Sequence, residues 1–232
     1  MELFGKTLIW LATAGVIASL IMYLRGEQWI RQARWTFRGV AVLVSASLGL
    51  LLTLILLHRF DFVYVRNYSS DDLPLYYLIA TLWGGQEGTL LLWIFFVSML
   101  TFILTRTAGR FERYSMAIVN LFVLSVLVIL LKRSPFEATT DAPMQGAGLN
   151  PLLQDFWMTI HPPIMFVGFA LSIFPFALAI AGWLRQEYKA WASHAWVWLL
   201  ATWCTLVTAL VMGGYWAYKV LGWGGYWAWD PV

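Results

Sequence analysis

Long apolar stretches separated by short polar segments run along the whole chain, and no strand-type alternation interrupts them. A helix needs roughly 20 apolar residues to cross a bilayer core of about 30 Å, and six stretches are long enough. The pattern therefore predicts an all-α integral membrane protein, folded as a single polytopic domain over residues 1–232. The expected transmembrane helices cover residues 7–24, 39–57, 89–105, 114–131, 162–184 and 195–217.

The composition agrees with this pattern. Apolar residues make up 61% of the 232 residues and charged residues 12%, with a mean hydropathy of +0.72. Soluble domains are about 45–50% apolar and about 25% charged, so a soluble enzyme domain and a disordered chain are excluded. The single cysteine, Cys204, excludes a disulfide scaffold and a cysteine-rich zinc site. A net charge of +3, from scattered lysines and arginines, excludes nucleic acid as a partner.

Lysine and arginine are divided unequally between the two sets of loops that the six spans create. One set carries nine of them and the other carries six. The richer side is expected to face the cytoplasm or its organellar equivalent, so both chain ends face outward. The unusual residues lie on the outward side, in segments 59–88, 132–161 and 219–232, and the function is expected there.

Residues 149–160 have apolar side chains at helical spacing on one face, with Gln154 and Asp155 on the polar side. Asn150 before Pro151 is a good helix start, because asparagine caps a helix and proline suits its first position. The segment is too short to cross a membrane, so it is expected to lie in the interface as a short amphipathic helix. The alternative is a loop that packs on the spans.

His161 precedes Pro162 and Pro163, and proline is favoured in the first turn of a helix. We therefore expect a transmembrane helix to begin at Pro162, with His161 as its cap on the outward surface. The positive end of a helix favours the neutral imidazole, which is the form that binds metal ions. A capping or interfacial histidine without a metal is the alternative.

The segment from Trp83 to Gly88 interrupts an otherwise apolar run and has three glycines in five residues, which break or bend a helix. Its carboxylate, Glu87, is costly at membrane depth unless it is paired or close to water. Trp83 and Glu87 are therefore candidate site residues. The alternative is that the segment is only the outer end of the third span.

Residues 215–229 are dense in aromatic side chains that carry a polar edge. An aromatic belt at the membrane surface uses such residues, but the intervening glycines allow a flat ligand to approach the backbone. Haem is a large flat cofactor that also needs a ligand such as histidine, and a sugar-stacking platform is a weaker alternative. Asp230 before Pro231 is a helix-start signal. The aromatic residues are Tyr215, Trp216, Tyr218, Trp223, Tyr226, Trp227 and Trp229.

Three stretches together resemble the haem lyases of the CcmF and NrfE type, which act in cytochrome c maturation. They are residues 82–93 (LWGGQEGTLLLW), residues 149–155 (LNPLLQD) with residues 160–163 (IHPP), and residues 223–232 (WGGYWAWDPV), which resemble the tryptophan-rich WWD signature. The chain departs from that signature at Tyr226 and Ala228, where tryptophan and phenylalanine are usual. The likeness covers most of the chain in order and corresponds to the N-terminal portion of these proteins.

This resemblance implies a function in presenting haem b for covalent attachment to apocytochrome c on the outer face of the membrane. His161 matches the first outward-facing haem ligand of the family, as the iron's axial ligand, and residues 219–232 begin the haem platform. The platform residues would be Trp223, Trp227, Trp229 and Asp230, with Trp216, Tyr226, Trp83 and Glu87 as further cofactor-binding candidates. The other ligands would lie downstream, so this chain is expected to be part of a holocytochrome c synthase without complete haem sites, and no catalytic side chain is assigned.

The resemblance also implies partners and a location. The partners would be the haem chaperone CcmE, apocytochrome c, CcmH-type thiol subunits, the lipid membrane and a companion chain with the rest of the lyase; a quinol is a further candidate. The location would be the bacterial inner membrane or the mitochondrial inner membrane, with the functional face outward. Two alternatives are a haem exporter or carrier without attachment chemistry, and a structural or quinone-binding membrane subunit of a respiratory complex.

Overall fold

The computed structural model describes residues 1–139 and 145–222. Six helices are long and apolar enough to cross a membrane, which confirms the all-α membrane fold. Each of them overlaps one predicted span. They are α1 (Glu2–Arg25), α2 (Ile30–Leu56), α5 (Gln86–Thr107), α6 (Glu112–Lys132), α7 (Phe156–Leu184) and α8 (Ala190–Val220). The shorter elements are α3 (Val63–Tyr68), α4 (Leu75–Ala80) and four 3-10 turns: η1 (Glu27–Trp29), η2 (Thr81–Trp83), η3 (Gly109–Phe111) and η4 (Pro151–Leu153).

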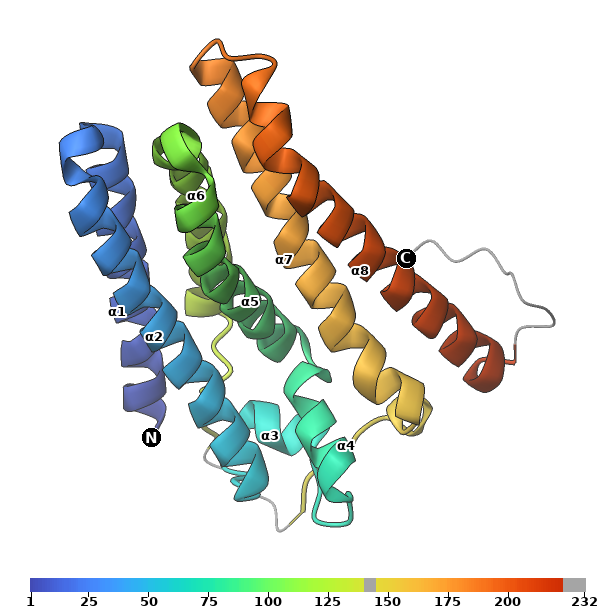
Figure 1. The fold of residues 1–232 in the computed structure, drawn as a ribbon. Coiled ribbons are helices and arrows are strands. Elements are labelled where there is room, and N and C mark those ends of the chain that lie inside the picture. Colours follow the sequence, from blue (N-terminus) through green and yellow to red (C-terminus); the bar gives the residue numbers. More distant parts are fainter. Residues whose placement is uncertain (140–144, 223–232) are drawn as a thin grey trace.

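The long helices form three antiparallel pairs, α1–α2, α5–α6 and α7–α8, and the two ends of the bundle differ (Figure 1). One end carries only the short connections around residues 26–29, 108–111 and 185–189; we call it the hairpin end. The other end carries the N-terminus, α3, α4, residues 133–139 and 145–155, and the C-terminal end of α8; we call it the loop-rich end. The three segments expected to hold the function therefore leave the bundle at the same end, because each pair of helices returns the chain to it.

Helices α5 and α6 each contact three other long helices: α5 contacts α2, α6 and α7, and α6 contacts α1, α5 and α7. Helix α1 packs against α2 and α6. Helix α8 packs mainly on α7, and its membrane-spanning window is 17% buried against 39–50% for the other five helices. Its outer faces expose Trp196, Trp203 and Leu210. Exposed apolar side chains on this face are not costly in a bilayer, because they would contact lipid tails or further helices.

The expected interfacial helix over residues 149–160 is wrong. The segment divides into the turn η4, where Asn150 accepts a hydrogen bond from the Leu152 amide as predicted, and the start of α7 at Phe156. Asp155 is the N-cap of α7, with its side chain accepting from the Trp157 amide at 2.9 Å. Because this cap lies six residues before His161, the helix also begins earlier than the expected start at Pro162.

A buried ion pair ties three helices together at the hairpin end. Glu112 of α6 is 2% exposed and accepts two hydrogen bonds from the Arg34 guanidinium of α2. The Tyr23 hydroxyl of α1 donates to the same carboxylate at 3.2 Å. Arg113 adds two hydrogen bonds, at 2.9 Å each, to the carbonyls of Tyr23 and Leu24 at the end of α1. A buried carboxylate with this many donors is stable only while all of them are present.

We predict that Glu112→Gln lowers the free energy of unfolding by about 2 kcal/mol, because Arg34 loses its charged partner in a half-buried place. Chemical or thermal unfolding in detergent micelles measures the change. Glu27→Gln is the matched control, since that glutamate is exposed and lies 3.8 Å from Arg185; it should cost less than about 0.5 kcal/mol. Equal losses in the two variants would contradict a stabilising role for the buried pair.

Candidate functional site

His161 lies in the second turn of α7, half-buried against the last turns of α8. Its imidazole is stacked on the indole of Trp216, with ring centroids 6.2 Å apart and planes inclined by 22°. The ring also meets the backbone of α8 at Gly213, where an added Cβ would stand 3.0 Å from the imidazole Cε1 and Nδ1. Because Gly213 has no side chain, the imidazole of His161 can pack directly against the backbone of α8.

The imidazole of His161 makes no hydrogen bond to any of the residues that the structure describes. Its Nδ1 is buried without a hydrogen-bond partner within residues 1–139 and 145–222, and Nε2 makes no hydrogen bond there either. His194 differs, because its Nδ1 lies 3.1 Å from the Ala190 carbonyl oxygen. His58 Nδ1 also has no hydrogen-bond partner among the described residues, but an Asp71 carboxylate oxygen lies 3.3 Å from it, whereas no carboxylate stands at that distance from His161 in the described residues. A capping or structural histidine would use its nitrogens, and His161 leaves both of them for a ligand.

Polar contacts fix the foot of α8 beside His161. Lys219 Nζ donates to Asp155 Oδ2 at 2.8 Å, and the Trp216 indole donates to the Leu152 carbonyl at 3.3 Å. Burial acts to raise the pKa of Asp155, but the hydrogen bonds from Lys219 and from the Trp157 amide hold it below its usual value. Asp155 thus stays charged at neutral pH, where it both caps α7 and holds α8.

These observations fit a haem-iron ligand in part. Histidine is a usual axial ligand of haem iron, and an unengaged imidazole beside a stacked tryptophan is suited to that role. The predicted platform residues Trp223, Tyr226, Trp227, Trp229 and Asp230 lie outside the described residues. Within the described part of the chain, His161 and Trp216 are the two predicted site residues whose rings are brought together.

Trp83 and Glu87 line two different pockets. Trp83 ends η2 and lines a small pocket of about 10 Å³ with Leu149, Leu153 and Met158, on the side of α7. Its indole nitrogen is buried and has no partner in the described segments. Met158 is three residues before His161 in α7, so Trp83 approaches the same helix start without a ring contact to the histidine in the part described.

Glu87 lies in the first turn of α5 and lines a different, polar pocket of about 240 Å³. Its companions include Glu137 and the two cations Lys132 and Arg133, which follow one another at the end of α6. Glu137, from the loop after α6, is a second carboxylate that lines the same pocket as Glu87. His161 is not among the residues that line this pocket.

Tyr64 holds the bend between α4 and α5 and was not singled out from the sequence. Its buried hydroxyl lies 2.9 Å from the Thr81 carbonyl and 3.0 Å from the Leu82 carbonyl, and it accepts from the Gly85 amide at 3.2 Å. Burial raises the pKa of Tyr64, so the hydroxyl remains a donor. A Cβ on Gly85 or Gly88 would collide with the tyrosine rings of α3, which explains both glycines by close packing.

Comparison with known proteins matches residues 83–232 to the model of the cytochrome c assembly protein family. The chain belongs to this family. It is 36% identical over 217 residues to the cytochrome c-type biogenesis protein CcmF of Pseudomonas aeruginosa, covering 90% of this chain and 33% of that protein. It is 35% identical to CcmF of Haemophilus influenzae over 84% of this chain and 31% of the relative. For NrfE of the same organism the identity is 33%, over 86% and 33%.

A solved structure agrees with the family assignment. The fold superimposes on a cytochrome c haem lyase CcmF with a TM-score of 0.82 and 28% sequence identity, over 99% of this chain and 38% of that one. The resemblance drawn from the three sequence motifs is therefore confirmed. The chain spans about a third of the length of the curated relatives it matches.

We predict that Tyr64→Phe lowers the free energy of unfolding by about 1–3 kcal/mol, because the Leu82 carbonyl and the Gly85 amide lose the hydroxyl as a partner, while the Thr81 carbonyl keeps only the Gly84 amide. Unfolding in detergent micelles followed by tryptophan fluorescence measures it. Tyr68→Phe is the control, since the Tyr68 hydroxyl makes no hydrogen bond among the described residues. That variant should stay within about 0.5 kcal/mol of the wild type; a larger loss for Tyr68→Phe than for Tyr64→Phe would refute the assignment.

Proposed function

We propose that this chain is the haem-handling part of a cytochrome c haem lyase, and that it presents haem b at its loop-rich end for attachment to apocytochrome c. The observation that carries the proposal is the unengaged imidazole of His161 stacked on Trp216. The names of the relatives, cytochrome c-type biogenesis protein and cytochrome c haem lyase, supply the reaction. His161 stands within the family segment matched at residues 83–232.

In this proposal His161 would be a ligand of the haem iron through its imidazole. Trp216 limits rotation of the imidazole, and the contact of Asp155 with Lys219 keeps α8 next to α7. Haem, when bound, supplies the vinyl groups that react with the cysteine thiols of apocytochrome c. Trp223, Trp227 and Trp229 would stack on its face, with Tyr226, Asp230, Trp83 and Glu87 as further contacts.

We place the loop-rich end outside a bacterial or mitochondrial inner membrane. The support is the unequal division of basic residues, because nine of the lysines and arginines fall at the hairpin end. The partners on the outer side would be the haem chaperone CcmE, apocytochrome c and CcmH-type subunits. A quinol would be a further partner.

We predict that His161→Ala lowers the haem bound per chain at least about tenfold, since loss of a ligand costs more than loss of a supporting group. Reduced-minus-oxidised spectra of the complex purified from its native membranes measure bound haem, and the yield of covalent cytochrome c measures the activity. His194→Ala is the control, because that imidazole is at the hairpin end and is held by a backbone carbonyl.

The two readouts separate the alternatives. Haem lost together with cytochrome c yield supports the lyase, whereas haem lost with full cytochrome c yield supports a carrier without attachment chemistry. Unchanged haem and unchanged yield in His161→Ala, at equal amounts of protein in the membrane, would refute the proposed site.

Gly213 gives a second test that leaves the imidazole in place. We predict that Gly213→Ala shifts the absorption bands of bound haem or lowers haem occupancy, because the new methyl group presses on the His161 ring. Gly214→Ala is the matched control, since nothing lies within 4 Å of its added Cβ. Both changes favour helix formation by up to about 1 kcal/mol, so unfolding stability in the haem-free protein should not fall for Gly214→Ala. Identical haem spectra in the two variants would contradict the placement of His161.

A further inference from the structure

The hairpin end holds more positive charge than its own carboxylates neutralise. Three acidic residues lie there, and each already faces an arginine: Glu27 faces Arg185, Glu112 faces Arg34, and Glu187 faces Arg110 and Arg185. The remaining cations at this end have no carboxylate within ion-pair distance in the described part of the chain. They are Arg25, Arg31, Arg38, Arg106, Arg113 and Lys189.

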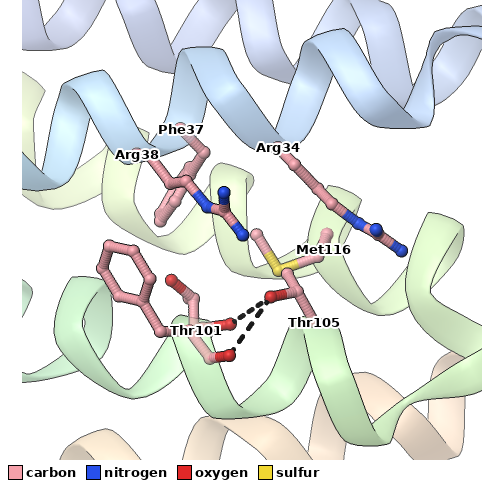
Figure 2. Close-up of a pocket in the computed structure, with 7 residues that line it drawn as sticks. Arg34, Phe37, Arg38, Thr101, Thr105 and Met116 are labelled. Atoms are coloured by element: carbon pink, nitrogen blue, oxygen red, sulfur yellow. Dashed lines mark hydrogen bonds between the residues drawn. The ribbon is translucent and has the colours of Figure 1, made fainter.

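Arg38 is a half-buried member of this set that lies against two aromatic rings. Its guanidinium carbon lies 4.7 Å from the ring centroid of Trp35 and 5.7 Å from that of Phe102, so the group is held between α2 and α5. It makes no hydrogen bond or ion pair with any residue that the structure describes, and its donors remain open. Figure 2 shows Arg38 on the same helix as Arg34 and reaching toward α5, where Thr101 and Thr105 lie.

The hydroxyl groups of Thr101 and Thr105 near Arg38 are used within their own helix. Thr105 donates to the carbonyls of Thr101 and Phe102, and Thr101 donates to the Ser98 carbonyl, so both protons stay within α5. The pocket between these side chains has a volume of about 10 Å³, which holds one water-sized group. An anion larger than that has to approach Arg38 from the surface of the bundle.

The surface around Arg38 is basic and aromatic. Arg31, Trp35 and Arg38 share one face of α2, because they are four and three residues apart, and Phe102 and Arg106 share a face of α5. The contact of Arg38 with Phe102 joins the two faces. We call this surface the basic seam: Arg31, Trp35, Arg38, Phe102 and Arg106.

Arg38 stands at the membrane surface. It directly precedes the span predicted over residues 39–57, so its guanidinium lies at the level where lipid headgroups are expected. Trp35 is 62% exposed beside it, as expected for an indole at the level of lipid headgroups. Val42, one turn further into the membrane, is also exposed and presents an apolar surface.

We propose that the basic seam binds the phosphodiester of an anionic phospholipid from the leaflet at the hairpin end, with Arg38 as the main contact. The guanidinium offers two parallel hydrogen bonds to phosphate oxygens, and Arg31 and Arg106 add positive charge toward the membrane surface. The acyl chains run past Val42 along the exposed side of α2. Inorganic phosphate has the same anionic oxygens as the headgroup, but it has no acyl chains that could contact the apolar surface at Val42.

The test uses the full chain in lipid nanodiscs of phosphatidylcholine, with or without phosphatidylglycerol. Thermal unfolding and mass spectrometry of lipids retained after extraction are the two readouts. Wild-type protein should unfold at a higher temperature with phosphatidylglycerol and retain that lipid. Arg38→Gln should retain about fivefold less, which corresponds to the worth of one arginine near anionic lipid, and should lose most of the temperature shift. Arg25→Gln removes one charge from the same end outside the seam and should behave as the wild type.

Three results would overturn the proposal. Equal lipid loss in Arg25→Gln and Arg38→Gln would mean a general surface charge. The same temperature shift from inorganic phosphate in phosphatidylcholine discs would mean a site for a free anion. No difference between the two kinds of disc would mean no anion site. If Arg38→Gln does not fold, as judged by its unfolding in phosphatidylcholine, Arg106→Gln takes its place with the same expectation. None of these readouts involves haem, so they stand apart from the function proposed for His161.

Discussion

Every backbone amide and carbonyl that enters a bilayer has to find its partner inside the protein, and this constraint governs the whole chain. The six long helices meet it by their own hydrogen bonds. The bend between α4 and α5 cannot do so, and there the Tyr64 hydroxyl serves two carbonyls and one amide. Gly85 and Gly88 permit that solution because only a residue without a side chain lets the tyrosine rings approach. The glycines of this motif are thus explained by packing, which leaves Glu87 free to line a polar pocket with Glu137.

A glycine also allows a ring to pack closely against the backbone at the proposed haem site. Gly213 of α8 faces the imidazole of His161 as Gly85 faces the tyrosines, and in both places a helix backbone lies against a ring. The result at α7 is a histidine that is positioned by its neighbours but not hydrogen-bonded by them in the described segments. A metal ligand needs a ring that is held in place and a nitrogen that is not hydrogen-bonded, because a nitrogen with a protein partner would have to break that hydrogen bond before it could bind the metal. The Asp155–Lys219 pair keeps the two helices in register around it.

The two ends of the bundle solve different electrostatic problems. At the hairpin end, arginines outnumber the carboxylates, and the buried Glu112 is shared by Arg34 and Tyr23. The surplus is suited to an anionic membrane surface, and Arg38 is the part of it that cannot simply extend into water because two rings confine it. At the loop-rich end the described residues form three ion pairs of Lys or Arg with a carboxylate: Lys6 with Glu2, Arg59 with Asp61, and Lys219 with Asp155. The lipid site and the haem site that we propose therefore lie at opposite ends of the bundle.

The six spans, their alternation and the shared end of the three unusual segments followed from the sequence, because apolar length and loop order are local properties of the chain. The family followed as well, since its motifs are contiguous. The start of α7 did not follow from the sequence. The apolar periodicity around Asp155 predicted a separate short helix, whereas in the structure Asp155 caps α7 through its hydrogen bond to the Trp157 amide. The partners of Glu112, Tyr64 and His161 also came only from the tertiary structure: Arg34 is 78 residues from Glu112, and the polar neighbours of Tyr64 lie 17 to 21 residues away. Periodicity tells which face of a helix is buried, but which side chain meets it there is decided by how distant helices pack.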